Sequence, residues 1–343
     1  MSFKVTVLPS QHEFTVEDGQ SVLDAALAAG IVLPYSCRNG ACSTCKGRVA
    51  EGDYVAGPGA AQIIPEEERE QGYTLFCQAI PLSDLTIEAQ EVRMASDIQI
   101  RKMPSRVMSM ESLAHDVMKL TLQLPTSEPF RYNPGQYLDF ILKDGRHRSY
   151  SMATPPVESN LVELHIRHTP GGAFTDHVFG TGATQMKVRE ILRVEAPLGS
   201  FFLRDSAKPA VFLASGTGFA PIKAMIEHMI ATGFDRPVHL YWGGRRPADL
   251  YMDALAREWA ATLPAFNYVP VLSEAEPADA WEGRTGFVHR AVMEDLPNLS
   301  NYQVYACGAP IMVDSARRDF TETCGLPEEE FFADAFTTAA DAA

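Results

Sequence analysis

The sequence contains no long run of apolar residues. Its most apolar stretch, PAVFLASGTGFAP, is interrupted by glycines and is too short to cross a membrane. The N-terminal stretch, MSFKVTVLPSQHEFTV, alternates like a pair of strands and lacks the apolar centre of a signal peptide. We therefore expect a cytoplasmic protein, and a reducing compartment disfavours stable disulfide bonds.

Positive charge is also scarce. The 343 residues include 29 Lys and Arg against 44 Asp and Glu, so the formal net charge is −15. This balance disfavours binding to the phosphates of nucleic acids. Outside the C-terminal TTAADAA the chain has no internal repeat and no low-complexity segment. Its length predicts two or three domains, each able to bury a core.

The first part of the chain has short strand-like runs around one helix. The helix is predicted over VLDAALAA, with Ser21 as its N-cap and Gly30 at its end. Two runs before it, FKVTVL and HEFTV, predict a hairpin of strands. The polar stretch SDIQIRKMPSR is the candidate linker to the next part.

Two further patterns follow. Residues 103–205 contain six short strand-like runs broken by turn residues, which predict a small antiparallel β-barrel. Residues 206–343 alternate apolar strands, glycine loops and helices, which is typical of a parallel α/β sheet. The predicted fold class is therefore multidomain, with an α+β unit, an antiparallel β-barrel and an α/β domain.

Cysteine is rare but clustered, because three of the six cysteines lie within CRNGACSTC. Cys37, Cys42 and Cys45 have the spacing C-x4-C-x2-C, and Cys77 follows at a distance. This is the plant-type [2Fe–2S] arrangement, and the small residues of the loop let backbone N–H groups approach the sulfurs. A zinc site, which usually has two short cysteine pairs, and free or disulfide-bonded cysteines are the alternatives.

Two segments of the middle part have residues suited to a flavin. In RSYS, an arginine can pair with a phosphate, a tyrosine can stack on a planar ring and a serine can bond a polar ring edge. In HIRHTPGGAFTDHVF, a glycine pair precedes a predicted helix start, where backbone N–H groups can hold an anion. An exposed strand and an ordinary glycine turn are the alternatives. The candidate cofactor-binding residues are Arg148, Ser149, Tyr150, Ser151, His165, Arg167, Gly171, Gly172, Ala173 and Thr175.

Three segments of the last part have residues suited to a nicotinamide nucleotide. SGTGFAP lies at a strand-to-helix turn, where glycines let a pyrophosphate approach, although a proline replaces the last glycine of GxGxxG. YWGGRRP and CGAP follow two later strands. The candidate residues are Gly216, Thr217, Gly218, Pro221, Gly243, Arg245, Cys307, Gly308 and Pro310.

These motifs together resemble a known family. Residues 1–92 resemble a plant-type ferredoxin domain of β-grasp type, whose four ligands match the four cysteines. RSYS and GAFT resemble the RxYS and GxxS motifs of the ferredoxin–NADP reductase superfamily, with Thr175 in place of serine. GTGFAP and CGAP resemble its nicotinamide motifs. The whole chain resembles the reductase components of oxygenases and the CDP-6-deoxyglucoseen reductases.

The resemblance implies a domain order and a set of cofactors. A [2Fe–2S] domain would span 1–92, an FAD-binding β-barrel 103–205 and an NAD(P)-binding α/β domain 206–343. FMN is the alternative flavin. A hydride from NAD(P)H would reach the flavin, and electrons would leave singly through the cluster to an acceptor protein. That acceptor would be an oxygenase component or, as the alternative, an iron–sulfur dehydratase acting on a sugar nucleotide.

The resemblance also implies residue roles. Tyr150 would pack on the flavin, Ser151 would lie near its reactive nitrogen, and Cys307 would border the nicotinamide and flavin rings. Phe336, with Phe332 as the alternative, would cover the flavin face. The structural alternative for Cys307 is a buried cysteine at the end of a strand. The alternative for Phe336 is packing of a final strand in the core. Glycines before Arg245 favour NADH over NADPH. A zinc-holding binding protein without enzymatic activity is the alternative of another class.

Overall fold

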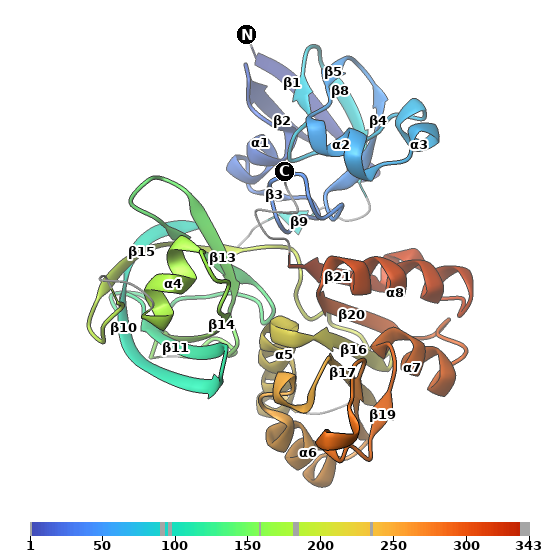
Figure 1. Cartoon of the computed structure of the whole chain (residues 1–343). Helices are drawn as coiled ribbons and strands as arrows, with labels where there is room; N and C mark the ends of the chain where they lie inside the picture. Colours follow the sequence, from blue (N-terminus) through green and yellow to red (C-terminus); the bar gives the residue numbers. More distant parts are fainter. Residues whose placement is uncertain are drawn as a thin grey trace. The chain divides into compact units, whose positions relative to one another are not determined.

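The computed structural model describes residues 2–89, 93–94, 98–157, 159–180, 185–233 and 236–336. It forms two compact units (Figure 1). The first is mainly Met1–Gln99, joined by Gly199–Phe201 and the residues from Ala335 onward, and the second comprises Ile100–Leu198 and Phe202–Asp334. Within the described residues, no helix has the length and apolar character needed to cross a membrane.

The first unit is built on a mixed five-stranded sheet with the order β2-β1-β8-β4-β6. Strands β1 and β8 run parallel, and the predicted hairpin of β1 and β2 is antiparallel. The strands are β1 (Ser2–Leu8), β2 (His12–Glu17), β3 (Ile31–Val32), β4 (Lys46–Glu51), β5 (Tyr54–Val55), β6 (Tyr73–Leu75), β7 (Ile80–Pro81), β8 (Leu85–Glu88) and β9 (Arg93–Met94). The helices are α1 (Val22–Ala28), α2 (Pro58–Ile63) and α3 (Glu66–Glu70).

Helix α1 begins where the sequence predicts. The Ser21 hydroxyl oxygen accepts a hydrogen bond from the backbone N–H of Asp24 over 3.1 Å, which satisfies one of the free donors of the first turn. Val22 and Leu23 are fully buried against the sheet, as are Val5 and Val7 of β1. Alternating apolar residues in the strand and one apolar face of the helix therefore form the core of this unit.

The second unit starts with a six-stranded antiparallel sheet of order β13-β12-β15-β10-β11-β14. A bridge between Met152 and Leu164 joins its two edges, so the sheet closes on itself as a barrel. The six predicted runs all form strands, although the segment expected as a linker already belongs to β10 from Arg101, because it pairs with β15. The elements are β10 (Arg101–Ala114), β11 (Val117–Gln123), β12 (Tyr137–Ile141), β13 (His147–Ser151), β14 (Leu161–Arg167), α4 (Ala173–Phe179) and β15 (Ile191–Leu198).

The rest of the second unit is a six-stranded sheet of order β19-β18-β17-β16-β20-β21, parallel from β19 to β20. Its strands are β16 (Ala210–Ser215), β17 (Val238–Gly244), β18 (Phe266–Leu272), β19 (Arg284–Thr285), β20 (Gln303–Gly308) and β21 (Phe331–Ala335). Its helices are α5 (Phe219–Thr232), α6 (Asp253–Thr262), α7 (Val288–Asp295) and α8 (Pro310–Glu322). The short helices are η1 (Gly216–Gly218), η2 (Pro247–Asp249), η3 (Pro277–Asp279) and η4 (Glu328–Glu330).

The order of the strands places the helices on two faces. The chain moves outward from β16 to β18 and then returns to β20, so right-handed crossovers put α5 and α6 on one face and α7 and α8 on the other (Figure 1). Phe219 stacks on Trp242 with ring centroids 3.9 Å apart, which fixes the start of α5 on the sheet. The loops after β16, β17 and β20 consequently meet at one edge, where parallel α/β sheets bind ligands.

Candidate functional site

The four cysteines predicted as cluster ligands lie together in the first unit. Cys37, Cys42 and Cys45 belong to the loop between β3 and β4, and Cys77 follows β6. The backbone N–H of Cys37 donates to the Sγ of Cys42 over 3.4 Å. The thiols form two hydrogen-bonded pairs, Cys37 with Cys42 and Cys45 with Cys77, and the two pairs interact electrostatically. The fold therefore collects four sulfur donors at one place.

Hydrogen bonds to sulfur favour the thiolate at two of these positions. The Cys42 thiol, helped by the backbone N–H groups of Asn39 and Ala41, lowers the pKa of Cys37 to about 7 although burial opposes this. The Cys45 thiol likewise lowers the pKa of Cys77. The partner thiols and burial raise the pKa of Cys42 and Cys45 in turn. Thiolate is the form of cysteine that binds iron, and four sulfur donors gathered in one loop region fit a [2Fe–2S] cluster.

Gln78 holds the cysteine loop in shape, a role that no sequence motif indicated. Its side-chain amide donates to the carbonyl of Asn39 over 3.0 Å and accepts from the N–H of Gly59 over 2.8 Å. A Cβ on Gly40 would lie 2.3 Å from this amide, and Gly40 has a φ of +86°. Only glycine therefore lets the loop pass this close to Gln78.

The predicted flavin residues of RSYS form most of β13. Side chains alternate along a strand, so Arg148 and Tyr150 share one face, and Ser149 and Ser151 share the other. The Tyr150 ring packs on Phe174 with centroids 5.4 Å apart, and burial raises the pKa of its hydroxyl. Among the described residues Arg148 has no carboxylate within ion-pair distance, so its charge is available for a phosphate. Ser149 is exposed and Ser151 is buried.

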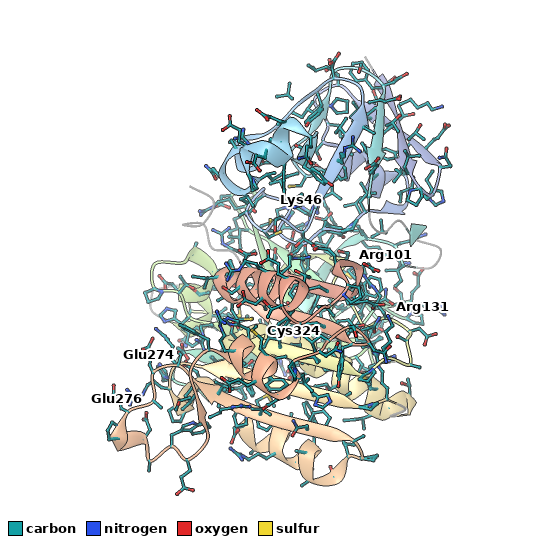
Figure 2. All side chains as sticks on the ribbon, turned by 90° about the vertical axis from the view of Figure 1, so that its right-hand side faces the viewer. Lys46, Arg101, Arg131, Glu274, Glu276 and Cys324 are labelled. Atoms are coloured by element: carbon teal, nitrogen blue, oxygen red, sulfur yellow. The ribbon has the colours of Figure 1, made fainter. Side chains whose placement is uncertain are left out.

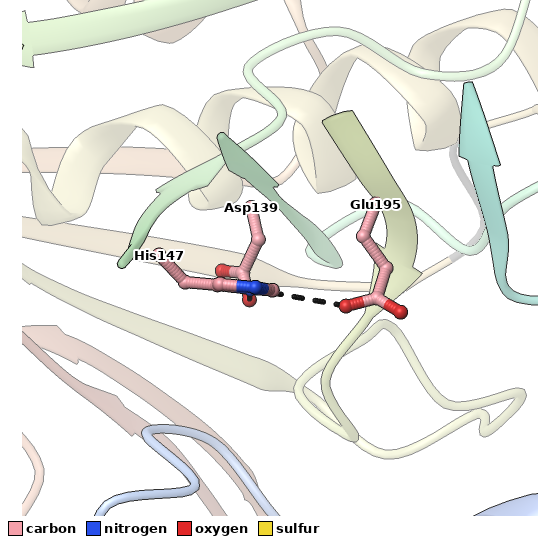
Figure 3. A group of neighbouring side chains, drawn as sticks. All are labelled: Asp139, His147 and Glu195. Atoms are coloured by element: carbon pink, nitrogen blue, oxygen red, sulfur yellow. Dashed lines mark hydrogen bonds and ion pairs between the residues drawn. The ribbon is translucent and has the colours of Figure 1, made fainter. Parts of the chain in front are cut away.

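A group of polar side chains fixes the other face of β13. Asp139 of β12, His147 of β13 and Glu195 of β15 point toward one another (Figure 3). The buried carboxylate of Asp139 accepts from the Ser149 hydroxyl over 2.6 Å and lies 3.1 Å from Nδ1 of His147. Glu195 lies 3.8 Å from the same nitrogen. These contacts lock three adjacent strands and hence the strand that presents Arg148.

The predicted anion turn lies between β14 and α4. Gly172 is the N-cap of α4, Ala173 is its first residue, and Gly171 has a φ of +83°. The Thr175 hydroxyl, expected to face a cofactor, donates to the carbonyl of Thr169 over 2.8 Å. Thr175 therefore shapes the turn in this structure, and its contact with a cofactor stays a prediction.

His165 and Arg167, both on β14, face the α/β part of the same unit. The His165 side chain is fully buried, and its contact with a cofactor stays a prediction. The Arg167 guanidinium lies 3.4 Å from the carboxylates of Asp116 and Asp249 and is close to Gly216. Its Nε and Nη2 are buried and interact with these two carboxylates through charge rather than through a well-formed hydrogen bond, so the contact of Arg167 with a cofactor stays a prediction.

The loops of GTGFAP and CGAP touch at the edge of the parallel sheet. A Cβ on Gly218 would lie 2.1 Å from the carbonyl oxygen of Cys307, and one on Gly308 would lie 2.2 Å from the Ser215 hydroxyl. That hydroxyl accepts from the N–H of Ala309 over 2.9 Å. Thr217 lies inside η1, Pro221 in the first turn of α5 and Pro310 at the start of α8.

Cys307 and Phe336, both predicted as catalytic residues, lie in places that do not by themselves indicate contact with a cofactor. Cys307 is completely buried, and burial raises the pKa of its thiol, so the structure agrees with the strand-end alternative at least as well as with a catalytic role. Phe336 belongs to the first unit, and Phe332 stacks on Tyr305 with centroids 5.0 Å apart. Contact of Phe336 with a flavin stays a prediction.

Gly243 lies near the end of β17, and Arg245 begins the loop that follows this strand. A Cβ on Gly243 would lie 2.9 Å from the Cβ of Val288, so this strand end packs tightly on α7. Arg245 follows β17, and its side chain is 67% exposed. Together, glycines without space for a side chain and arginines with available N–H groups fit the phosphates of a flavin and a nicotinamide nucleotide.

Comparison with known domain families agrees with this division of the chain. Residues 5–82 match the 2Fe-2S iron-sulfur cluster binding domain, 104–203 the oxidoreductase FAD-binding domain and 212–318 the oxidoreductase NAD-binding domain. The chain therefore has domains for a [2Fe–2S] cluster, FAD and NAD(P)H, which confirms the cofactors and the fold class predicted from the sequence. The domain boundaries and the individual site residues stay predictions.

Curated relatives share the whole length of the chain. It is 40% identical to the CDP-6-deoxy-L-threo-D-glycero-4-hexulose-3-dehydrase reductase of Yersinia pestis, over 98% of this chain and 99% of that one. It is 37% identical to reductase component 1 of terephthalate 1,2-dioxygenase from a Comamonas species, over 98% of both chains. The cytochrome P450 reductase GcoB of Amycolatopsis has a similar structure, with a TM-score of 0.78, 32% identity and coverage of 98% and 99%.

Replacing Cys42 by serine should remove the iron–sulfur absorption and lower the iron content to near zero, because one of four sulfur donors is lost. Flavin content should stay unchanged, since the flavin residues belong to the other unit. Iron analysis and the visible spectrum check both statements. Cys324→Ser is the matched control, because Cys324 is a buried cysteine of the second unit (Figure 2). Loss of flavin with Cys42→Ser would contradict separate sites.

The stability of the second unit should fall as the pH drops below about 6.5. Burial lowers the pKa of His165 from its ordinary value, so below that value the unfolded chain binds more protons than the folded one. The contribution of neutral His165 to the free energy of unfolding is therefore fully present above about pH 6.5. It is lost as the pH falls toward the lowered pKa of the folded state. Urea unfolding followed by flavin fluorescence at several pH values measures this slope.

His165→Gln should make the slope of unfolding free energy against pH shallower, by up to about 1.4 kcal/mol per pH unit. His115→Gln serves as the control, since the His115 side chain is 74% exposed. Equal slopes for the wild type and His165→Gln would refute the assignment.

Proposed function

Because this chain belongs to the family of iron–sulfur flavoprotein reductases with a ferredoxin domain ahead of FAD- and NAD-binding domains, we propose that it delivers electrons from NADH to an oxygenase component. The chain is an NAD(P)H-dependent oxidoreductase. The main support for this acceptor is the full-length similarity to reductase components of oxygenases, at 37% identity in Comamonas and in Pseudomonas sp. strain CF600.

The side chains of this protein have distinct tasks in such a reaction. When bound, the flavin supplies the change from two-electron to one-electron chemistry, and the cluster carries single electrons. Arg148 would neutralise the flavin pyrophosphate, and Tyr150 would border the flavin ring. The loops at Gly216–Gly218 and Gly308–Pro310 would seat the nicotinamide nucleotide. Hydride transfer needs no general acid or base, so these residues orient their ligands and exclude water.

A second acceptor has support of its own. The chain is 40% identical to the Yersinia pestis reductase of a hexulose dehydrase. We therefore also consider a dehydrase acting on a sugar nucleotide as the acceptor, since the ferredoxin domain would serve either partner by the same chemistry. A cytoplasmic location completes the proposal, because a reducing compartment keeps cysteines in the thiol form that can bind a cluster.

The two acceptors are distinguished by reconstitution with purified partners. The holoprotein is mixed under NADH with the oxygenase component that the Comamonas reductase serves and, separately, with the dehydrase that the Yersinia reductase serves. We expect product formation coupled to NADH oxidation with the oxygenase component, and cytochrome c serves as a nonspecific electron acceptor in the control. Coupled turnover with the dehydrase alone would favour the second candidate. Turnover with cytochrome c alone would contradict both.

The surroundings of Arg246 support the choice of NADH. Its guanidinium forms ion pairs with Glu276 and, over 2.8 Å, with Asp279. Glu274 and Glu276 lie on the loop after β18 (Figure 2). A 2′-phosphate at this edge of the sheet would meet these carboxylates and an arginine that is already paired. NADH, which lacks this phosphate, avoids the repulsion.

The double substitution Glu276→Gln with Asp279→Asn should raise kcat/KM for NADPH by about tenfold, because it releases the Arg246 guanidinium for a phosphate. The value for NADH should change by less than about twofold. Steady-state reduction of cytochrome c with each nucleotide measures both. Glu282→Gln, an exposed acidic residue of the same connection, is the control. A wild type that prefers NADPH would contradict the choice of NADH.

A further inference from the structure

Lys223 is a buried cation of the second unit. It lies in the second turn of α5, shortly after the Gly216–Gly218 loop, and its side chain is 6% exposed. Its Nζ donates to the carbonyl of Ala153 over 3.0 Å and pairs with Glu227 over 2.9 Å and Glu163 over 3.3 Å. Burying an ammonium group is costly unless it is paired, so all three partners are needed to keep it inside.

The partners of Lys223 come from two different parts of the unit. Glu227 is on the same helix of the α/β part, whereas Ala153 and Glu163 belong to the β-barrel. Burial alone would raise the pKa of Glu163. The hydrogen bond that His165 donates and the charge of Lys223 outweigh burial and lower this pKa to about 2. Glu163 is therefore an anion at neutral pH. The Lys223 side chain ties the start of α5 to the barrel.

A second connection runs through His165. Its Nε2 lies 2.8 Å from Oε1 of Glu163, and its Nδ1 lies 2.9 Å from the Tyr251 hydroxyl. A carboxylate only accepts, so Nε2 carries the proton of the neutral ring and Nδ1 accepts from Tyr251. Tyr251 follows η2 and packs edge-on against Trp242, with centroids 5.2 Å apart. The chain of contacts thus reaches the segment after β17.

A third connection completes a row on β14. Glu163, His165 and Arg167 are spaced by two residues and so project from the same face of the strand. Arg167 pairs with Asp249 of η2 over 3.4 Å. A Cβ on Gly216 would lie 3.6 Å from the Arg167 guanidinium. One strand of the barrel therefore contacts α5, the Gly216–Gly218 loop and the segment after β17.

Ion pairs of this kind are a weak source of stability, because desolvation offsets most of the attraction. Apolar residues in the same places would hold the two parts together equally well. Directed hydrogen bonds differ from apolar contacts in that they permit only one relative position of the groups they join. The row on β14 is therefore better suited to setting a position than to adding stability.

We propose that Lys223, Glu163 and His165 are positioning residues that hold the Gly216–Gly218 loop at one distance from the flavin-binding barrel. This inference rests on the proposed nucleotide site at that loop. The loop would seat the nicotinamide nucleotide and the barrel the flavin, so the network would set how closely the two ligands meet. A misplacement of about 1 Å can slow a transfer step by about a hundredfold.

The test compares two neutralised ion pairs in the holoprotein. Lys223→Met with Glu163→Gln removes both buried charges, which avoids leaving one of them unpaired. Lys208→Met with Glu330→Gln removes a pair of 2.6 Å elsewhere in the α/β part and is the matched control. Tyr251→Phe, which removes one hydroxyl and little volume, is the milder variant should the first double variant not fold.

Anaerobic stopped-flow measurement of flavin reduction by NADH gives a limiting rate and an apparent Kd. We expect the limiting rate of the Lys223/Glu163 variant to fall by about tenfold or more, with an apparent Kd within about threefold of the wild type. Tyr251→Phe should lose about threefold in rate. The control pair should leave both quantities unchanged, as should flavin and iron contents in every variant.

Hydrogen–deuterium exchange supplies a readout that does not depend on activity. Peptides covering Gly216–Ile226 should exchange faster in the Lys223/Glu163 variant and at the wild-type rate in the control. The inference would be overturned if the Lys223/Glu163 and Tyr251 variants both kept limiting rates near the wild-type value and showed unchanged exchange. That result would leave the proposed function intact. A wild type whose flavin is not reduced by NADH would instead refute the proposed function.

Discussion

The edge of the parallel sheet that carries the predicted nicotinamide residues depends on the close contact between the loops after β16 and β20. Parallel strands end at the same edge, so these loops must converge, and at Gly218 there is no space for a Cβ beside the carbonyl of Cys307. The Ser215 hydroxyl then joins the loops by accepting from Ala309. Because the first loop continues directly into α5, this contact also determines where Lys223 lies. The positions of the loop, of α5 and of Lys223 thus all follow from the close backbone contact between Gly218 and Cys307.

In both units, certain polar side chains hold the loops or strands that carry predicted site residues. In the first unit Gln78 bonds two backbone segments of the cysteine loop, where glycines leave only enough space for its amide. In the barrel, Asp139 and His147 lock the strand of Arg148. On β14, Glu163 and His165 reach the α/β part. Such groups contribute little net stability, but they specify one arrangement where apolar packing would allow several.

The acceptors named for the relatives are diverse, whereas the chain length and domain order are shared. Reductases of a hexulose dehydrase and of a terephthalate dioxygenase both align with 98% of this chain. The FAD- and NAD-binding domains therefore lie within the length that this chain shares with these relatives, whereas the acceptors differ. This is why the reaction class follows from the motifs and the acceptor requires an experiment.

The sequence by itself determined the order of the domains and most strands, and it predicted the four cluster ligands that the fold brings together, because these depend on local features. Cysteine spacing, the Ser21 cap and the alternation of apolar residues each act over a few residues. Only the tertiary structure decided that His165 is buried against Tyr251, that Thr175 bonds its own turn and that Arg101 already belongs to a strand. Ala153, a partner of Lys223, and Tyr251, a partner of His165, lie 70 and 86 residues away along the chain. No local pattern encodes such contacts, because a buried polar residue looks like an exposed one until the fold supplies its partner.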